Sequence, residues 1–201
     1  MRCFHLLRET FEFVMQNLFE ITLVTIAWLL LQLPVITAPA ATVGVFYFAR
    51  QALLRDEAQF RDFSLGVRTF FWRSWLVVLP ALLLVAVAAY DIAFFVAQDE
   101  PMIRLAASIP MAVLGFLLIV QNYALVFFVR ERGALWMSIT RAALLALSDP
   151  LFTFAVLLMT MLYLLVLYAT KIGLALVFVG PMAVLQSKAV AHLLASRGVE
   201  F

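Results

Sequence analysis

Charge is what this sequence most lacks. Only 13% of its 201 residues are Asp, Glu, Lys or Arg, about half the share found in soluble domains, whereas 66% are hydrophobic. The core of a water-soluble protein of this length could not hide so much apolar surface, so the composition argues against that class. The net charge of +2 is also too small to favour nucleic acid as a partner.

The missing charges leave five long uncharged runs, at residues 21–49, 74–90, 105–129, 150–170 and 172–187. A helix rises about 1.5 Å per residue, so about 20 apolar residues cross a hydrocarbon layer ~30 Å thick. The sequence therefore predicts an all-α, polytopic membrane helix bundle, and the lipid bilayer is its expected partner. Its five membrane segments are expected at about 21–49, 75–95, 105–129, 150–170 and 172–194.

Cysteine, glycine and proline are scarce as well. The single cysteine, Cys3, cannot form a disulfide within the chain, and we expect it to be an inert thiol. With only 7 Gly and 7 Pro there is no Gly- or Pro-rich linker, and no internal repeat is visible. We therefore expect residues 1–201 to form a single integral membrane domain.

Two of the prolines interrupt the first membrane segment. Pro34 and Pro39 each remove a backbone donor and clash with the preceding turn, so one helix should end and another begin between them. Backbone groups freed at that depth need partners within the protein, and Thr37 and Thr42 can supply some of them. The break is interpreted as a kink, a site-forming discontinuity or a re-entrant hairpin, and the sequence leaves the three open.

The polar stretches between the runs carry helical patterns of their own. Residues 4–19 predict an amphipathic helix, either lying in the membrane interface or forming the wet end of the first segment. Residues 50–73 and 130–148 predict further interfacial helices. A tight turn is expected at 170–173 between the last two segments, and Gly180-Pro181 should kink the fifth.

The distribution of basic residues predicts an orientation. The 50–73 stretch holds five of the 14 Lys and Arg, the 130–149 stretch holds three, and the 91–104 stretch holds only Arg104. Because cytoplasmic loops are enriched in Lys and Arg, the arginine-rich loops and the C-terminus are expected in the cytoplasm. The N-terminus lies outside if the first run crosses once, and inside if that run is re-entrant.

The sequence shows no catalytic set, metal-ligand spacing or phosphate-binding loop, so we expect neither an enzyme nor a cofactor. Uncharged polar groups in the runs are the candidate functional positions: Gln32, Thr37, Gln121 and Asn122. Such groups mostly stabilise helix–helix contacts, by roughly 0.6–2 kcal/mol each, and the alternative is a solute-binding cluster. Glu20, at the membrane edge, is expected to be solvated or paired with a nearby arginine.

The first 75 residues carry a recognisable pattern. An apolar helix containing Trp28 leads into Leu-Pro-Val-Ile-Thr-Ala-Pro-Ala at 33–40, and Phe-Arg-Asp-Phe follows at 60–63. The pattern resembles the YesL-like bacterial membrane proteins, the family of domain of unknown function 624. Its motif positions here are Pro34, Pro39, Asp62 and Phe63. The resemblance implies a multi-pass protein of the bacterial cytoplasmic membrane with a link to carbohydrate uptake.

Two functions are therefore expected. The first is a non-enzymatic accessory or assembly protein that works with a membrane transport complex or as a homo-oligomer. The alternative is a small-solute transporter or channel that uses the broken first helix. An accessory protein requires a tightly packed interior, whereas a carrier requires a polar cavity at the membrane midplane.

Overall fold

The structure is a computed structural model, and it describes residues 2–151, 153–158, 162 and 179–195. Side chains at 2–7, 101, 118–119 and 122 are not among those described. The regular elements of this part of the chain are helices, which agrees with the predicted all-α class. They are α1 (Arg2–Gln16), α2 (Leu18–Gln32), α3 (Ala38–Arg55), α4 (Phe60–Val96), α5 (Pro101–Leu105), α6 (Ser108–Arg130), α7 (Leu135–Ser148) and α9 (Val179–Ala195).

The N-terminal amphipathic helix is separate from the helix that follows it. Helices α1 and α2 meet at Asn17 with a bend of 86°, so α1 is not a straight extension of α2. Helix α1 packs instead along α9, where the Lys188 ammonium donates a 2.9 Å hydrogen bond to the Glu9 carbonyl. The stretch thus forms a helix of its own, and the choice between an interfacial helix and the wet end of the first segment stays a prediction.

The predicted break in the first long run is confirmed. Helix α2 ends at Gln32, residues 33–37 form turns, and α3 begins at Ala38. Pro34 lies in the turn, while Pro39 occupies the first turn of α3, where a missing N–H costs no helical hydrogen bond. The Thr37 hydroxyl lies within hydrogen-bonding distance of the carbonyls of Leu31 and Pro34, as the sequence predicted for this side chain.

The expectation of a separate interfacial helix over 50–73 is wrong. Helix α3 continues to Arg55 and ends because Asp56 adopts a left-handed conformation, with φ of 56°. Helix α4 then begins at Phe60 and runs without interruption through Pro80 to Val96, a length of 37 residues. Residues 60–73 of the arginine-rich stretch and the second apolar run are therefore joined in one helix, because no break or left-handed residue separates them.

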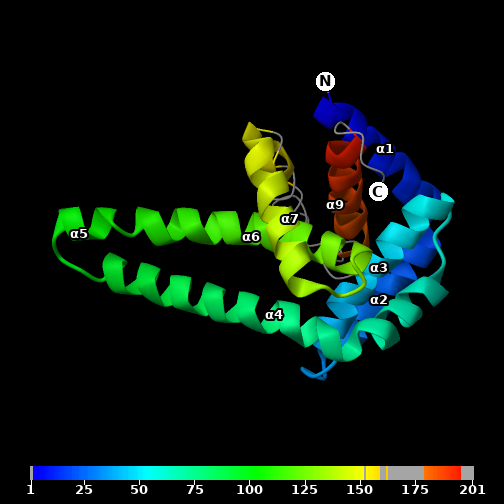
Figure 1. Cartoon of the computed structure of the whole chain (residues 1–201), viewed down its shortest axis with the longest axis horizontal. Coiled ribbons are helices and arrows are strands. Elements are labelled where there is room, and N and C mark those ends of the chain that lie inside the picture. Colours follow the sequence, from blue (N-terminus) through cyan, green and yellow to red (C-terminus); the bar gives the residue numbers. More distant parts are fainter. Residues whose placement is uncertain (1, 152, 159–161, 163–178, 196–201) are drawn as a thin grey trace.

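Helix α3 is the centre of the body of the molecule. It contacts α2, α4, α6 and α9, and its burial is nearly continuous. The large side chains at the centre of this core include Phe48, Phe63, Phe127 and Phe128. Away from the body, α4 and α5–α6 run side by side as a long projecting hairpin, with α7 folded back beside α6 (Figure 1).

The later segments agree with the sequence where they can be compared. Helix α6 covers most of the predicted run 105–129, and Pro101 opens α5. Helix α7 occupies the larger part of the predicted helical stretch 130–148, from Leu135 onward. The predicted segment 150–170 is described only in part, and the predicted turn at 170–173 lies outside the described residues. The fifth segment is described from Val179 onward.

One described helix, Phe60–Val96, is long and apolar enough to cross a membrane. Residues 8–16 and 18–32 would qualify together as a second, if the bent pair counts as one span. Shorter apolar helices occur at Met102–Leu117 and Leu135–Ser148. Within the described residues, length and composition thus support fewer than the five predicted spans.

Candidate functional site

The predicted polar position Gln32 lies at the end of α2, where it faces the first turns of α3. Its amide nitrogen lies 3.4 Å from the Thr42 hydroxyl oxygen, and the Trp28 indole nitrogen approaches the same oxygen at 3.4 Å. The Thr42 hydroxyl itself donates to the carbonyl of Ala38 at 3.0 Å. The polar groups on the two sides of the break therefore contact one another.

A second element also stabilises the break. The indole nitrogen of Trp75, on α4, donates a 3.2 Å hydrogen bond to the carbonyl of Ile36. This bond satisfies a backbone acceptor within the turn, which has no helical partner of its own. The turn between α2 and α3 is therefore held by contacts between these two helices and by a hydrogen bond from α4.

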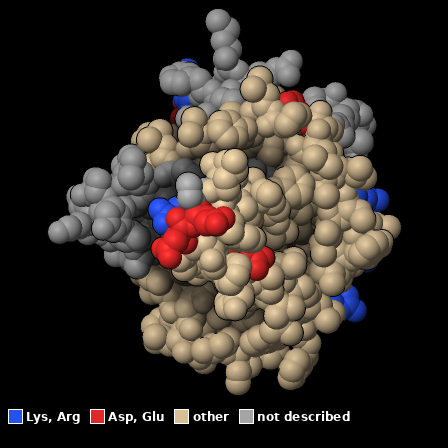
Figure 2. Space-filling view, turned by 90° about the vertical axis from the view of Figure 1, so that its left-hand side faces the viewer, with Lys and Arg blue, Asp and Glu red and all other residues tan. Residues whose placement is uncertain are grey.

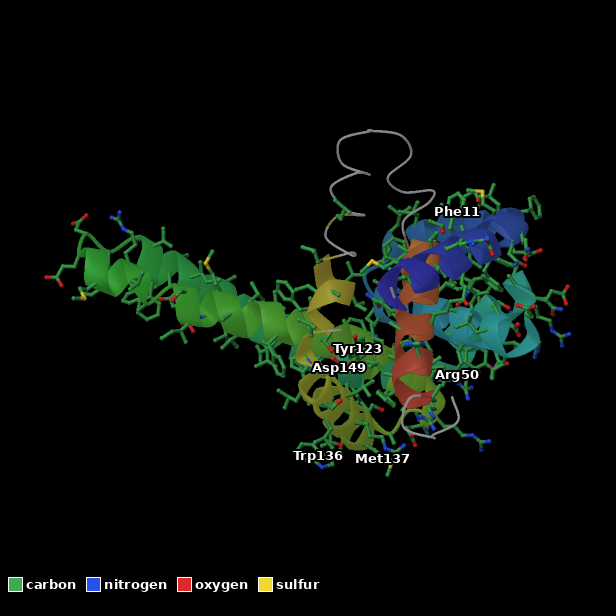
Figure 3. All side chains as sticks on the ribbon, turned by 90° about the horizontal axis from the view of Figure 1, so that it is seen from above. Phe11, Arg50, Tyr123, Trp136, Met137 and Asp149 are labelled. Atoms are coloured by element: carbon green, nitrogen blue, oxygen red, sulfur yellow. The ribbon has the colours of Figure 1, made fainter. Side chains whose placement is uncertain are left out.

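The other two predicted polar positions, Gln121 and Asn122, lie on α6, away from the break between α2 and α3. Gln121 is half-buried on α6, and the Asn122 side chain is outside the described part. Next to them Tyr123 is almost fully buried, and Figure 3 places it close to Asp149 at the end of α7. The structure thus places Gln32 and Thr37 together and Gln121 on another helix.

The motif residues Asp62 and Phe63 lie in the first turn of α4. The Asp62 side chain is only 4% exposed, and the Arg55 guanidinium contacts both of its oxygens, at 3.0 and 3.2 Å. Phe63 is buried in the core beside Gly44. The Arg55–Asp62 ion pair joins the end of α3 to the start of α4, and Phe63 packs against α3. Asp62 and Phe63 therefore have a structural role.

Two polar side chains near the start of α2 accept hydrogen bonds at the same corner, and the sequence predicted neither of these partners. The Glu20 carboxylate accepts a 2.7 Å hydrogen bond from the backbone N–H of Phe60, and the Asn17 side-chain oxygen accepts one from Ala58 at 3.1 Å. Glu20 is half-buried, and it has a backbone partner that the sequence did not predict. A carboxylate suits this position because the first N–H groups of a helix lack partners and carry partial positive charge.

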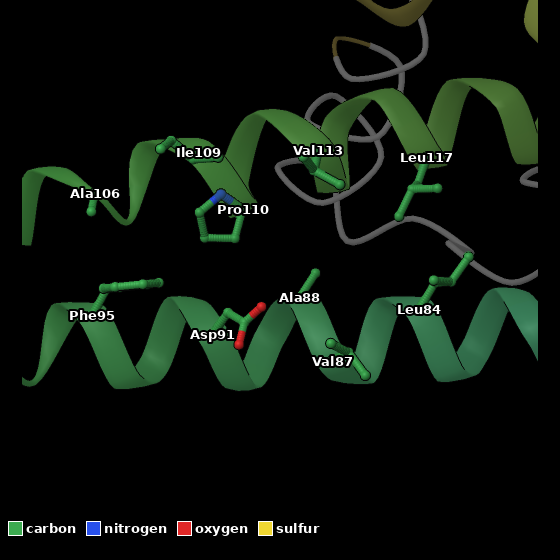
Figure 4. A pocket seen from close by; sticks show the side chains of 10 residues that line it. All are labelled: Leu84, Val87, Ala88, Asp91, Phe95, Ala106, Ile109, Pro110, Val113 and Leu117. Atoms are coloured by element: carbon green, nitrogen blue, oxygen red, sulfur yellow. The ribbon is translucent and has the colours of Figure 1, made fainter.

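An apolar groove follows the projecting hairpin between α4 and α5–α6. Its volume is about 310 Å³, and Asp91 is the one charged side chain among its ten lining residues (Figure 4). Asp91 lies opposite Pro110, which has no N–H to donate. Looking at the hairpin from its end, acidic side chains gather at the tip beside a small basic patch, and uncharged surface lies below and to the right of them (Figure 2).

A second and more polar cleft lies where α3, α4 and α6 meet, and its volume is about 550 Å³. Four arginines line it together with polar and aromatic side chains: Tyr47, Arg50, Gln51, Thr69, Phe70, Arg73, Val129, Arg130 and Arg132. In Figure 3 nitrogen-tipped side chains gather around the labelled Arg50. The sequence placed these arginines in two loops but gave no sign that they converge.

The cleft is built on a tightly specified turn. Arg132 and Gly133 both have positive φ, of 52° and 92°, which ends α6 and turns the chain toward α7. The Arg73 guanidinium donates a 2.8 Å hydrogen bond to the Arg132 carbonyl. A Cβ at position 133 would lie 2.9 Å from the Arg73 side chain, so glycine is needed here for both conformation and space.

The electrostatics of the cleft are those of crowded cations. Arg50 lies just beyond the first uncharged run, and its partial burial, together with the nearby charge of Arg130, lowers its pKa. Glu131, on the turn, forms an ion pair with Arg141 of α7, and its charge also partly offsets the lowering of the Arg50 pKa. The cleft therefore combines a half-buried positive charge with an aromatic base, formed where the Tyr47 and Phe70 rings lie 6.0 Å apart.

Residues 21–92 match the model of a family described as "Protein of unknown function, DUF624". This segment comprises most of α2, all of α3 and most of α4, and it contains all four motif positions. The resemblance expected from Pro34, Pro39, Asp62 and Phe63 is thus supported over this segment, while the YesL-like relationship stays a prediction. The search of curated proteins gave no match, and neither did the search of solved structures.

Proposed function

We propose that the chain is a multi-pass protein of a bacterial cytoplasmic membrane and acts there as a non-enzymatic accessory or assembly protein. The observation that supports membrane placement best is the hairpin of α4 and α5–α6. The most apolar 18-residue window of α4 is only 11% buried, whereas the core helix of a soluble protein would be covered by its neighbours.

The side chains exposed along the hairpin are large and apolar on both arms. On α4 they include Leu79, Leu82, Leu83, Val87 and Phe94, and on α6 they include Ile109, Met111, Val113 and Phe116. A continuous apolar surface of this kind is unfavourable in water and suited to lipid. We infer that the hairpin crosses the bilayer with its acidic tip outside, and that the runs 21–49, 150–170 and 172–194 supply the remaining segments.

The accessory function is favoured over the carrier by what surrounds the break. A carrier of the predicted kind would use Gln32, Thr37 and Gln121 to line a polar cavity. Neither the apolar groove nor the arginine cleft is lined by any of these three side chains. Gln32 and Thr37 instead lie against groups on either side of the break. The assembly partner we propose is a carbohydrate transport system, which the resemblance to the YesL-like proteins implies.

Replacing an exposed leucine of the hairpin by arginine tests the membrane placement. Leu83 is 67% exposed near the middle of the apolar part of α4, and arginine at the centre of a span costs about 2.5–3.5 kcal/mol. We expect Leu83→Arg to lower the fraction of protein that remains in membranes after an alkaline carbonate wash. Leu54→Arg, at a 51% exposed position in the arginine-rich stretch, should behave as the wild type.

A water-soluble protein would give a different result in this experiment. In a water-soluble protein both leucines face solvent, so both arginine variants would be tolerated and would remain in the soluble fraction. Release of the wild-type chain by carbonate, with Leu83→Arg unchanged, would contradict the proposal.

A further inference from the structure

We propose that the groove between α4 and α5–α6 binds one lipid molecule whose headgroup carries an ammonium group. The groove follows the projecting hairpin and has a volume of about 310 Å³. Asp91 of α4 is the one charged side chain among its ten lining residues, and it lies partway along the groove between apolar side chains (Figure 4). The site rests on the proposed membrane placement of the hairpin, and it adds a ligand that neither the family match nor the motif suggests.

The position of Asp91 along α4 places it at the level of the lipid headgroups. The uncharged run 74–90 ends directly before it, and these 17 helical residues span about 26 Å, close to the ~30 Å thickness of the hydrocarbon layer. Tyr90, the last residue of this run, is exposed, as aromatic side chains at a membrane interface commonly are. With the tip of the hairpin outside, Asp91 therefore lies where the headgroup layer of the outer leaflet begins.

The charge of Asp91 has no partner within the part of the chain that the structure describes. Its carboxylate forms neither an ion pair nor a hydrogen bond there. Arg104 of α5, the one basic residue between positions 91 and 104, donates instead to the carbonyl of Gln98, at 3.1 and 3.3 Å. Pro110 lies opposite Asp91 on α6 and has no N–H to donate. Because a half-buried carboxylate in apolar surroundings is stabilised by a nearby positive charge, the groove favours a cationic ligand.

The rest of the lining selects among cations. A metal ion of the calcium type needs several oxygen ligands, whereas Asp91 supplies the only carboxylate of the groove. The described residues also contain no group of three or more His, Cys, Asp or Glu side chains that could hold a metal ion. An ammonium group, by contrast, needs a single carboxylate, to which its N–H donors form short, charge-assisted hydrogen bonds. An organic ammonium ion is therefore the cation that suits this site.

The groove continues from Asp91 toward the body of the molecule with an apolar lining. Over about two turns of each helix this part is lined by Leu84, Val87, Val113 and Leu117 (Figure 4). In the proposed orientation this direction leads into the hydrocarbon layer, where acyl chains lie. An acyl chain below an ammonium group is the arrangement found in phosphatidylethanolamine. The volume is at the lower end of the range for small-ligand sites, so it suits part of one lipid rather than a helix about 10–12 Å across.

Thermal unfolding of the full chain in detergent tests the site, with phosphatidylethanolamine and phosphatidylcholine of the same acyl chains as the two added probes. Both headgroups carry a positive charge at nitrogen, but the quaternary ammonium of phosphatidylcholine has no N–H to donate. The altered protein is Asp91→Asn, which removes the charge and keeps the size of the side chain. The matched control is Asp99→Asn, at an exposed position of the tip that does not line the groove.

We expect phosphatidylethanolamine to raise the unfolding midpoint of the wild type and of Asp99→Asn by about 3–6 °C more than phosphatidylcholine does, at a concentration about ten times its dissociation constant. Asp91→Asn should lose most of this difference, with an apparent affinity at least about tenfold weaker, because the charge-assisted hydrogen bond is gone. Two results would overturn the proposal: equal responses of the wild type to the two lipids, or the same preference for phosphatidylethanolamine in Asp91→Asn as in the wild type.

A second pair of variants tests the apolar part of the groove, and it replaces the first pair if Asp91→Asn does not fold. Val113→Trp fills the groove at a 49% exposed position. Met111→Trp adds the same side chain to α6 at a 58% exposed position that does not line the groove. Val113→Trp should weaken the response to phosphatidylethanolamine, and Met111→Trp should retain it. An undiminished response in Val113→Trp would count against the site.

The carbonate wash keeps this result separate from the test of membrane placement. Asp91→Asn should remain in washed membranes as the wild type does, because the loss of one charge makes the hairpin more apolar. A wild type that remains in membranes but shows no preference for phosphatidylethanolamine would contradict the lipid site alone. A wild type released by carbonate would contradict the membrane placement on which the site rests.

Discussion

Gly44 on α3 and Gly66 on α4 bring the two helices into backbone contact. A Cβ added to Gly66 would lie 3.1 Å from the Gly44 Cα and 2.8 Å from the Tyr47 Cβ. At Gly44, an added Cβ would lie 2.6 Å from the Val67 side chain. This crossing is the most extensive helix–helix contact of the described structure, and it sets the position of Tyr47 and Phe70 beneath the arginine cleft.

The first prediction concerns this crossing. Gly66→Ala should destabilise the protein by about 1–3 kcal/mol, because the nearest atoms are backbone or Cβ atoms that cannot rotate away. Gly115→Ala is the matched control, since a Cβ there meets nothing within 4 Å. It should leave stability unchanged or raise it by up to about 1 kcal/mol through helix propensity. Thermal unfolding in detergent distinguishes the two, and equal effects would argue against a close crossing.

The hydrogen bond from the Phe60 N–H to Glu20 provides the second prediction. Glu20→Ala leaves the first turn of α4 without this acceptor and should cost about 0.5–2 kcal/mol. Glu20→Gln retains an oxygen acceptor and should cost less. Glu57→Ala, which removes an exposed carboxylate from the loop between α3 and α4, should be close to neutral. Hydrogen exchange at the start of α4 is the direct measurement, and unchanged protection in Glu20→Ala would contradict the cap.

The Arg55–Asp62 pair leads to a prediction of asymmetry. The Asp62 side chain is 4% exposed and the Arg55 side chain 49%, so only the carboxylate depends on its partner for stabilisation. Arg55→Leu should therefore destabilise the protein by about 2–4 kcal/mol, because it leaves a buried charge unpaired. Asp62→Asn should cost clearly less, since Arg55 can turn to solvent. Equilibrium unfolding of the two variants measures the difference, and the reverse order would show that the carboxylate is better solvated than its burial indicates.

The fourth prediction tests orientation. In a Cys3→Ser background, single cysteines at Glu57 and Asp99 occupy exposed positions, in the loop between α3 and α4 and at the tip of the hairpin. The concentration of arginine near position 57 predicts that this loop is cytoplasmic. An impermeant thiol reagent added to intact cells should label position 99 and spare position 57, whereas both should react after lysis. Labelling of position 57 alone would reverse the proposed topology.

The fifth prediction separates the accessory function from the carrier. Cysteines at Gln32 and Gln121 probe two half-buried positions in the predicted membrane segments, and a cysteine at Asp99 is the accessible control. A packed interior predicts that a small, water-soluble thiol reagent labels position 99 much faster than 32 or 121. Rapid labelling at both 32 and 121 would reveal a water-filled path and would favour the carrier.

Several features of the fold were predictable because their causes are local. The helical class follows from long uncharged runs, and the break between α2 and α3 follows from Pro34, whose missing N–H acts within one turn. Pro101 opens α5 for the same kind of reason. The prediction of a separate helix over 50–73 was wrong. Charged residues indicate where a chain meets water, but a helix can continue from such a stretch into an apolar one, as α4 does.

The tertiary structure decided what lies far apart in the chain. Glu20 meets Phe60 across 40 residues, and Arg73 meets the Arg132 carbonyl across 59. Composition and periodicity assign each of these residues to a helix or a loop, but the partner depends on how the helices cross. That crossing is set by the absence of side chains at Gly44 and Gly66, a steric condition between two elements. The sequence by itself therefore determined a lipid-compatible helical chain with a broken first run, and the packing of α3, α4 and α6 turned scattered arginines into one cleft.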